Sequence, residues 1–307
     1  MQKIIVSCLI CLSALTSVTA QQAGHFSQYT FNKLNFNPAL LGAYEALTLS
    51  GFYRHQWFGV AGAPRTGLLN VIAPLTRHNT VLGMSLSYDQ IGMTQTGQAA
   101  ASYTYVVRMN NGMQLMGGLN GMVEYGRVDW TLADPSNPQD GLIGDGAENV
   151  WKPNFGAGLG INTRSWYAGL SVPRFLKNHL FRGNQVDEPK AIAFNEIYLM
   201  GGVDFRLGNN VRFRPSLLIS YNPSAPLDIA GDASFLMFNR LILGAAYRLE
   251  DAATAFVQYR FSPQWKMGVA YDFTLSDLNH FSNGSAEFMM EYTFDRAEDG
   301  TRHIRFF

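Results

Sequence analysis

Residues 265–275 read WKMGVAYDFTL, and they alternate between large apolar side chains and small or polar ones. One face of this segment would carry Trp265, Met267, Val269, Tyr271, Phe273 and Leu275. The other face would carry Lys266, Gly268, Ala270, Asp272 and Thr274. Successive side chains of a β-strand point to opposite faces, so a period of two predicts a strand with one apolar face and one polar face.

The same period of two recurs in residues 82–89, 211–221 and 285–295. Soluble β-sandwiches also alternate, so this pattern alone leaves that fold open. Three features favour a membrane barrel: the apolar faces end in aromatic residues, the polar faces are rich in Gly, Ser and Ala with charges of both signs, and the connections alternate in length. No stretch of about 18 apolar residues follows the N-terminus, so we expect any membrane span to be a β-strand.

We predict an all-β fold, a transmembrane antiparallel β-barrel of about 14 strands with short periplasmic turns and longer extracellular loops. The expected strands are 46–57, 65–75, 80–90, 95–109, 112–127, 153–162, 165–173, 191–207, 210–222, 226–238, 240–250, 252–262, 265–276 and 285–295. The long connections include 128–152 and 174–190, which we place outside the cell. An even strand count leaves both termini in the periplasm.

Met1 to Ala20 have the features of a signal peptide: Lys3, then an apolar run, then a small-x-small site that predicts cleavage after Ala20. Both cysteines, Cys8 and Cys11, lie inside it, so the mature chain has neither a disulfide nor a thiol nucleophile. The 307-residue chain balances 23 basic against 23 acidic residues, which gives no reason to expect nucleic-acid binding. These features suit an exported protein of a Gram-negative envelope.

We divide the chain into a signal peptide (1–20), an N-terminal segment (21–45), the barrel (46–295) and a periplasmic tail (296–307). The N-terminal segment is too apolar for a free tail, and Pro38 interrupts any regular element. We expect it to fold back and plug or brace the periplasmic mouth of the barrel.

Several short sequence motifs, which occur in a fixed order, carry a resemblance to a known family. They are Phe26-Ser27-Gln28-Tyr29, Asn37-Pro38-Ala39, Tyr53-Arg54-x-Gln56-Trp57, Gly62-Ala63-Pro64-Arg65-Thr66, Tyr167-Ala168-Gly169-Leu170-Ser171 and Leu275-Ser276-Asp277-Leu278. Together they resemble the PorP/SprF family of type IX secretion system membrane proteins over nearly all of the mature chain. His55 departs from the pattern, where Asn is more usual.

The resemblance implies an outer-membrane barrel of the Bacteroidetes that assists the export or surface anchoring of a partner cargo, such as a large adhesin with a C-terminal sorting domain, and in some relatives gliding motility. It also implies contact with outer-membrane lipid and with periplasmic secretion components and lipoproteins. The residues of the matching motifs that we take as partner-contact candidates are Phe26, Tyr29, Asn37, Pro38, Tyr53, Arg54, Gln56, Trp57, Pro64 and Arg65.

The alternation itself predicts a set of charges that face the lumen. They are Arg108, Arg212, Arg214, Arg248, Arg260, Lys266, Asp89, Asp204, Asp272 and Glu291. They could line an ion-selective pore, or they could pair and fill the lumen. We favour pairing, because charges in a low-dielectric interior need partners that offset desolvation.

We expect neither enzymatic activity nor a cofactor. The six histidines are scattered singly, and neither an H-x-x-x-H spacing nor a G-x-S-x-G elbow is present. The acids of 134–153 do not follow a calcium-loop spacing, which favours a solvated loop. Two other functions stay open: a channel for small solutes or hydrophobic ligands, and a soluble periplasmic binding protein.

Overall fold

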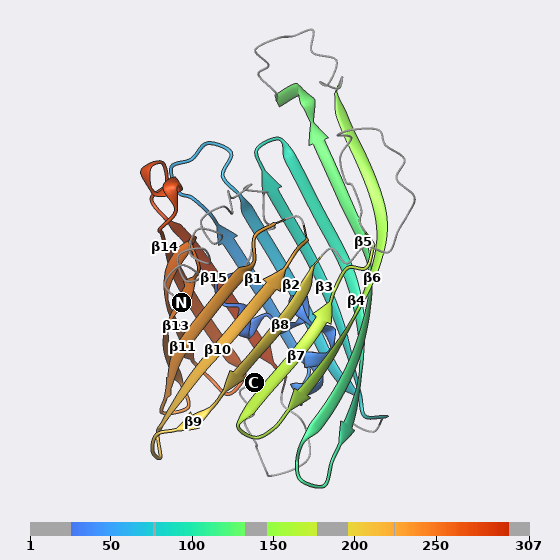
Figure 1. The fold of residues 1–307 in the computed structure, drawn as a ribbon, viewed down its shortest axis with the longest axis vertical. Coiled ribbons are helices and arrows are strands. Elements are labelled where there is room, and N and C mark those ends of the chain that lie inside the picture. Colours follow the sequence, from blue (N-terminus) through green and yellow to red (C-terminus); the bar gives the residue numbers. More distant parts are fainter. Residues whose placement is uncertain (1–25, 76–77, 133–145, 177–195, 224, 295–307) are drawn as a thin grey trace, which may run out of the picture.

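The protein is a closed antiparallel β-barrel, which Figure 1 shows from the side with its long axis vertical. The computed structural model describes residues 26–294 except 76–77, 133–145, 177–195 and 224. The strands are β1 (Thr48–His55), β2 (Arg65–Leu75), β3 (Thr80–Ile91), β4 (Thr94–Arg108), β5 (Gln114–Asp129), β6 (Ala147–Asn162), β7 (Trp166–Val172), β8 (Ile197–Val203), β9 (Phe205–Arg206), β10 (Val211–Tyr221), β11 (Asp228–Met237), β12 (Leu241–Arg248), β13 (Ala252–Arg260), β14 (Trp265–Thr274) and β15 (Ser285–Thr293).

The predicted fold is confirmed, and all fourteen expected strands are present. β8 and β9 together make one of them, interrupted at Asp204 opposite the segment of β10 that contains Pro215. Proline has no N–H to donate to a ladder, which accounts for a break at this point. Pairing of β1 with β15 closes the barrel.

The two faces of each strand are those that the alternation predicts. In β14, Val269 and Tyr271 are exposed on the outer surface, whereas Ala270 and Asp272 are buried inside. The exposed outer residues of the other strands are likewise large and apolar, including many Leu, Tyr and Phe. An outward apolar band of this kind is the surface that a barrel presents to lipid.

The connections differ at the two ends of the barrel, as expected. At one end each turn spans a few residues, such as the one between β6 and β7, while most of the longer connections lie at the other end. The turn at Gly92 and Met93 is a short connection at the long-loop end. One boundary was wrong: β6 begins at Ala147, not near Pro153, because residues 147–152 pair with β5 and lengthen the hairpin.

The barrel wall is taller on one side. β4, β5 and β6 have 15, 16 and 16 residues, whereas β7 and β8 have 7 each. In Figure 1 the β5–β6 hairpin therefore rises well above the neighbouring strands.

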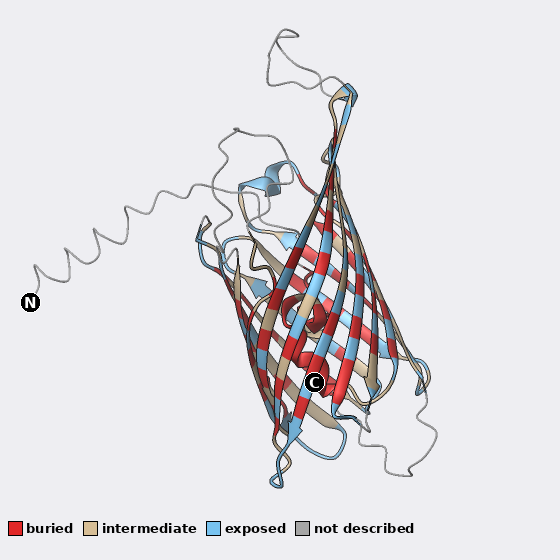
Figure 2. Cartoon of the chain, turned by 90° about the vertical axis from the view of Figure 1, so that its right-hand side faces the viewer, coloured by how far each residue is buried: buried red, intermediate tan, exposed pale blue. Residues whose placement is uncertain are grey.

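The described part of the N-terminal segment lies inside the barrel. It forms three short helical elements, η1 (Tyr29–Phe31), α2 (Lys33–Phe36) and η2 (Pro38–Ala43), which Figure 2 shows in red within the strands. No helix among the described residues has the length and apolar character needed to cross a membrane.

Candidate functional site

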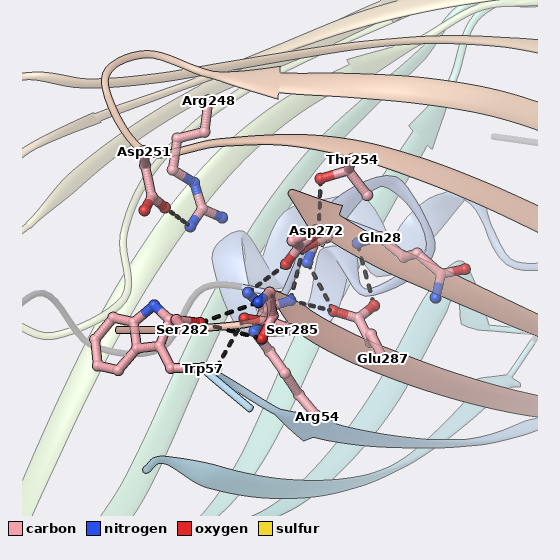
Figure 3. A network of polar contacts seen from close by, with 12 residues as sticks. Gln28, Arg54, Trp57, Arg248, Asp251, Thr254, Asp272, Ser282, Ser285 and Glu287 are labelled. Carbon is pink, nitrogen blue, oxygen red and sulfur yellow. Dashed lines mark hydrogen bonds and ion pairs between the residues drawn. The ribbon is translucent and has the colours of Figure 1, made fainter. Parts of the chain in front are cut away.

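The first anchor of the N-terminal segment is a cluster of three buried ionic groups (Figure 3). Arg54 extends from β1 between Asp272 of β14 and Glu287 of β15. Its Nη2 lies 2.6 Å from Asp272 Oδ2, and its Nη1 lies 3.4 Å from Glu287 Oε2. The alternation of β1 turns Arg54 into the lumen while its neighbour Tyr53 faces outward.

The chain of the N-terminal segment completes this cluster. The backbone N–H groups of Ser27 and Gln28 donate to the two oxygens of Glu287 at 2.7 and 3.1 Å. The Ser27 hydroxyl donates to Asp272 at 2.8 Å and accepts from Arg54 at 2.7 Å. Each carboxylate therefore has both a cation and hydrogen-bond donors, which offsets the cost of burying its charge.

Two further side chains extend the same anchor along β13. Thr254 donates to Asp272 at 2.7 Å, and the Gln258 amide donates to the Gln28 side chain at 2.7 Å. The four strands β13, β14, β15 and β1 thus hold residues 27–28 by directed bonds. We call these contacts the ionic anchor.

The second anchor lies across the lumen, where Asn37-Pro38-Ala39 rests on glycines of β5, β6 and β7. The Asn37 amide donates to the carbonyls of Leu159 and Leu170 at 3.0 and 3.3 Å. A Cβ on Gly118 would lie 2.4 Å from the Ala39 nitrogen, and one on Gly158 would lie 2.1 Å from Asn37 Oδ1. Glycine is therefore required here for the segment to approach the wall; we call this contact the glycine anchor.

Between the anchors and just after the second one, the segment packs into a hydrophobic core. Leu40 and Leu41 are 0% exposed, and Tyr29 is 1% exposed. Phe36 packs edge-on against Tyr198 of β8 with ring centroids 5.3 Å apart. The lumen of the described barrel is thus crossed by a peptide that is bonded to opposite walls and buried between them.

Lys33 is a buried cation in the middle of this peptide. Its Nζ lies 4.1 Å from the ring centroid of Tyr167, in a cation–π contact. The pKa of Lys33 is lowered to about 7, chiefly by burial and then by the charges of Arg214 and Lys266, while the charge of Asp232 opposes this shift. A small cavity of about 30 Å³ lies against Lys33, Tyr167 and Asp232.

Most of the predicted lumen-facing charges have a partner of opposite sign. Lys266 lies 2.9 Å from Glu291, and Arg212 lies 2.7 Å from Asp204, which Arg214 also contacts. Arg248 lies 3.0 Å from Asp251, and Asp272 belongs to the ionic anchor. Asp89 accepts from Thr66, Arg108 donates to Asn79, and Arg260 is half-exposed.

The partner-contact candidates divide between the interior and the rim. Phe26, Tyr29, Asn37, Pro38, Arg54, Gln56 and Pro64 are buried and contact this chain's own barrel. Tyr53 and Arg65 are exposed, and Trp57 is half-buried. Backbone bonds tie this rim together, since Phe58 N–H donates to Gly284 O and Gly92 N–H to Gly62 O, each at 2.8 Å.

Our sequence reasoning missed Glu287 and Ser27. Glu287 lies four residues before Glu291 on one strand, so the alternation alone would have assigned it to the lumen. Nothing local marks Ser27, because the two carboxylates that it contacts, Asp272 and Glu287, are 245 and 260 residues away in the chain. Within the described residues, no three His, Cys, Asp or Glu side chains group so as to hold a metal ion.

A closed antiparallel barrel with an outward apolar, aromatic band and a filled polar lumen defines an outer-membrane β-barrel protein. The family model for the type IX secretion system membrane protein PorP/SprF matches residues 18–292. The chain therefore belongs to the PorP/SprF family, as the resemblance predicted.

Solved structures of outer-membrane barrels are similar in fold. The Acinetobacter baumannii outer membrane protein Omp33 matches with a TM-score of 0.51 at 7% identity, over 82% of this chain and 100% of that chain. The CymD monoaromatic hydrocarbon channel matches with a TM-score of 0.55 at 13% identity, over 91% of this chain and 95% of that chain. A comparison with curated proteins found no match.

Proposed function

We propose that this protein is a non-enzymatic accessory barrel of type IX secretion that holds an exported partner at the cell surface and contacts secretion components on its periplasmic side. Family membership supports the link to type IX secretion. The partner would be a cargo with a C-terminal sorting domain, such as a large adhesin.

The observation that carries this proposal is the peptide braced across the lumen. A conduit for export through this barrel would require both anchors to release at once, although one of them contains three buried ionic groups. A filled barrel is better suited to presenting surfaces at its two ends. The long-loop end, which by the rule for outer-membrane barrels is extracellular, offers the tall β5–β6 hairpin for a partner.

The proposal is tested by affinity purification of the tagged protein from native outer membrane, followed by mass spectrometry. We expect one large exported protein and periplasmic secretion components to remain bound. Deletion of the gene should release that exported protein from the cell surface or trap it in the periplasm. Normal secretion and retention in the deletion strain would refute the proposal.

A channel for small solutes or hydrophobic ligands is the second candidate, since CymD is a monoaromatic hydrocarbon channel and shares this barrel shape. A sequence identity of 13% indicates a shared fold only, so experiment has to decide between the secretion role and the channel. Loss of solute uptake in the deletion strain, with secretion unchanged, would favour the channel.

A further inference from the structure

Among the residues that the structure describes, β6 has a neighbouring strand on only one side over much of its length. It pairs with β5 from Ala147 to Asn162, but with β7 only from Ala157 to Asn162. The part above β7 belongs to the tall hairpin that projects beyond the rest of the wall in Figure 1. Phe175 covers the lower end of this part, where its N–H donates to Phe155 O at 2.8 Å.

Backbone hydrogen bonds at the two ends of this part of β6 show which of its N–H and C=O groups face away from β5. Gly146 O accepts from Trp130 N–H on the β5 side, so the even-numbered residues direct their backbone groups toward β5. Phe155 O accepts from the other side, so the odd-numbered residues face away from β5. No backbone bond from the described residues reaches Ala147, Asn149 or Trp151 on this open side. We call residues 147–152 the β6 edge.

The β6 edge is held in ladder geometry, and no described residue pairs with it on the side away from β5. The rings of Tyr125 and Trp151 pack with centroids 4.6 Å apart, and the Tyr125 hydroxyl donates to Asn149 Oδ1 at 2.7 Å. Natural sheets blunt open edges with proline, with bulges and with charged side chains, especially lysine. The β6 edge, AENVWK, has neither a proline nor a bulge, and its two charges have opposite sign.

We propose that the β6 edge binds an extended segment of the exported partner, which adds to the sheet as one more β-strand. This inference rests on the proposed function and names the surface and the chemistry of the contact. Unpaired N–H and C=O groups at every second residue are satisfied by an extended polypeptide and by few other ligands.

The charged side chains of the β6 edge indicate which side chains the partner segment should carry. Glu148 and Lys152 lie on the lumen-side face of β6 on either side of Val150, and neither forms an ion pair with another described residue. Glu124, which is opposite Lys152, is already bound by Arg174 at 2.9 Å. A matching strand would place a basic side chain beside Glu148, an acidic one beside Lys152 and an apolar one between them.

A second copy of this chain is unsuited to pair with the β6 edge. Antiparallel pairing of two β6 edges needs a twofold axis perpendicular to the sheet. The sheet stands upright in the membrane, so this axis would turn one barrel upside down. Two barrels inserted in the same direction cannot meet in this way, which leaves a different polypeptide as the occupant.

Amide hydrogen exchange of the purified protein tests whether the edge is free. We expect the amides of Asn149 and Trp151 to exchange fast and those of Val150 and Lys152, which face β5, to exchange slowly. In the complex with the copurified exported protein, the first two should slow at least about tenfold. Protection of Asn149 and Trp151 in the isolated protein would show that the chain covers its own edge, and would overturn the inference.

Asn149→Pro tests the contact in the complex. It removes an N–H on the open side and leaves the β5 ladder intact, and Pro153 already occupies an equivalent position four residues later. Asn149→Ala is the matched control, because it also loses the Tyr125 bond but keeps the N–H. Heat-modifiable migration reports whether both variants are folded.

We expect Asn149→Pro to retain at least about tenfold less exported protein than Asn149→Ala, because one backbone bond and the strand register are lost. Equal retention by the two variants would overturn the edge contact alone. A wild-type barrel that retains no exported protein would instead overturn the proposed function, and with it the partner named here.

Discussion

Arg54 joins three parts of the chain that are remote in sequence: the N-terminal segment, the first strand and the last two strands. Replacing it with alanine would leave Asp272 and Glu287 buried together without a cation. Loss of one partner from a buried ion cluster costs about 3–5 kcal/mol. We expect Arg54→Ala to lower the temperature at which heat-modifiable migration is lost. The exposed Arg65→Ala serves as control and should leave that temperature within about a degree.

The lowered pKa of Lys33 predicts how the stability of the fold depends on pH. Between about pH 7 and the ordinary pKa of 10.5, the unfolded chain carries a proton on Lys33 that the folded chain lacks. Stability should therefore rise with pH across this window and be lowest below it. Lys33→Met should stabilise the protein most at pH 6 and little at pH 10. Equal stabilisation at both values, measured by thermal unfolding in detergent, would contradict the lowered pKa.

Individual residues were predictable from sequence only as far as their face of the sheet. The alternation assigned Asp272 and Lys266 to the lumen because lipid and lumen impose opposite chemistry on adjacent side chains. It could not assign Arg54 to its partners, because that contact depends on how the first and last strands register when the barrel closes. Arg54 therefore looked like a rim residue beside Trp57.

At the scale of elements, the N-terminal segment is held by backbone contact as much as by side chains. Gly118 and Gly117 are adjacent in β5, but only Gly118 faces the segment; a Cβ on Gly117 would meet nothing within 4 Å. We expect Gly118→Ala to displace Asn37-Pro38-Ala39 and to make the segment accessible to protease in the folded barrel. Gly117→Ala is the matched control, and cleavage at equal rates in both variants would argue against the glycine anchor.

The sequence predicted where the strands lie, but it did not predict how far each strand extends beyond its neighbours. A two-residue period is a local property, and it located all fourteen strands because each of them separates lipid from lumen. The early start of β6 at Ala147 has no such signal, since residues 147–152 lie in a hairpin that rises above the neighbouring wall. Pairing with β5 alone extends this strand.

At the scale of the whole molecule, we expect the braced peptide to obstruct conduction through the barrel. Deleting residues 21–42 would remove both anchors and every side chain that the segment contributes to the hydrophobic core. We expect the variant, if it still shows heat-modifiable migration, to have a higher conductance in planar bilayers than the full chain. An unchanged conductance in a folded barrel would show that the segment does not obstruct the lumen.

The ionic anchor also has a consequence for the order of assembly. The barrel closes where β15 meets β1, and Glu287, Asp272 and Arg54 all lie at or next to that junction. Ser27 lies before the first strand of the barrel, while the carboxylates that it contacts lie on the last two strands. The ionic anchor is therefore complete only once β1 and β15 have paired, so closure of the wall and fixing of the peptide inside it are coupled.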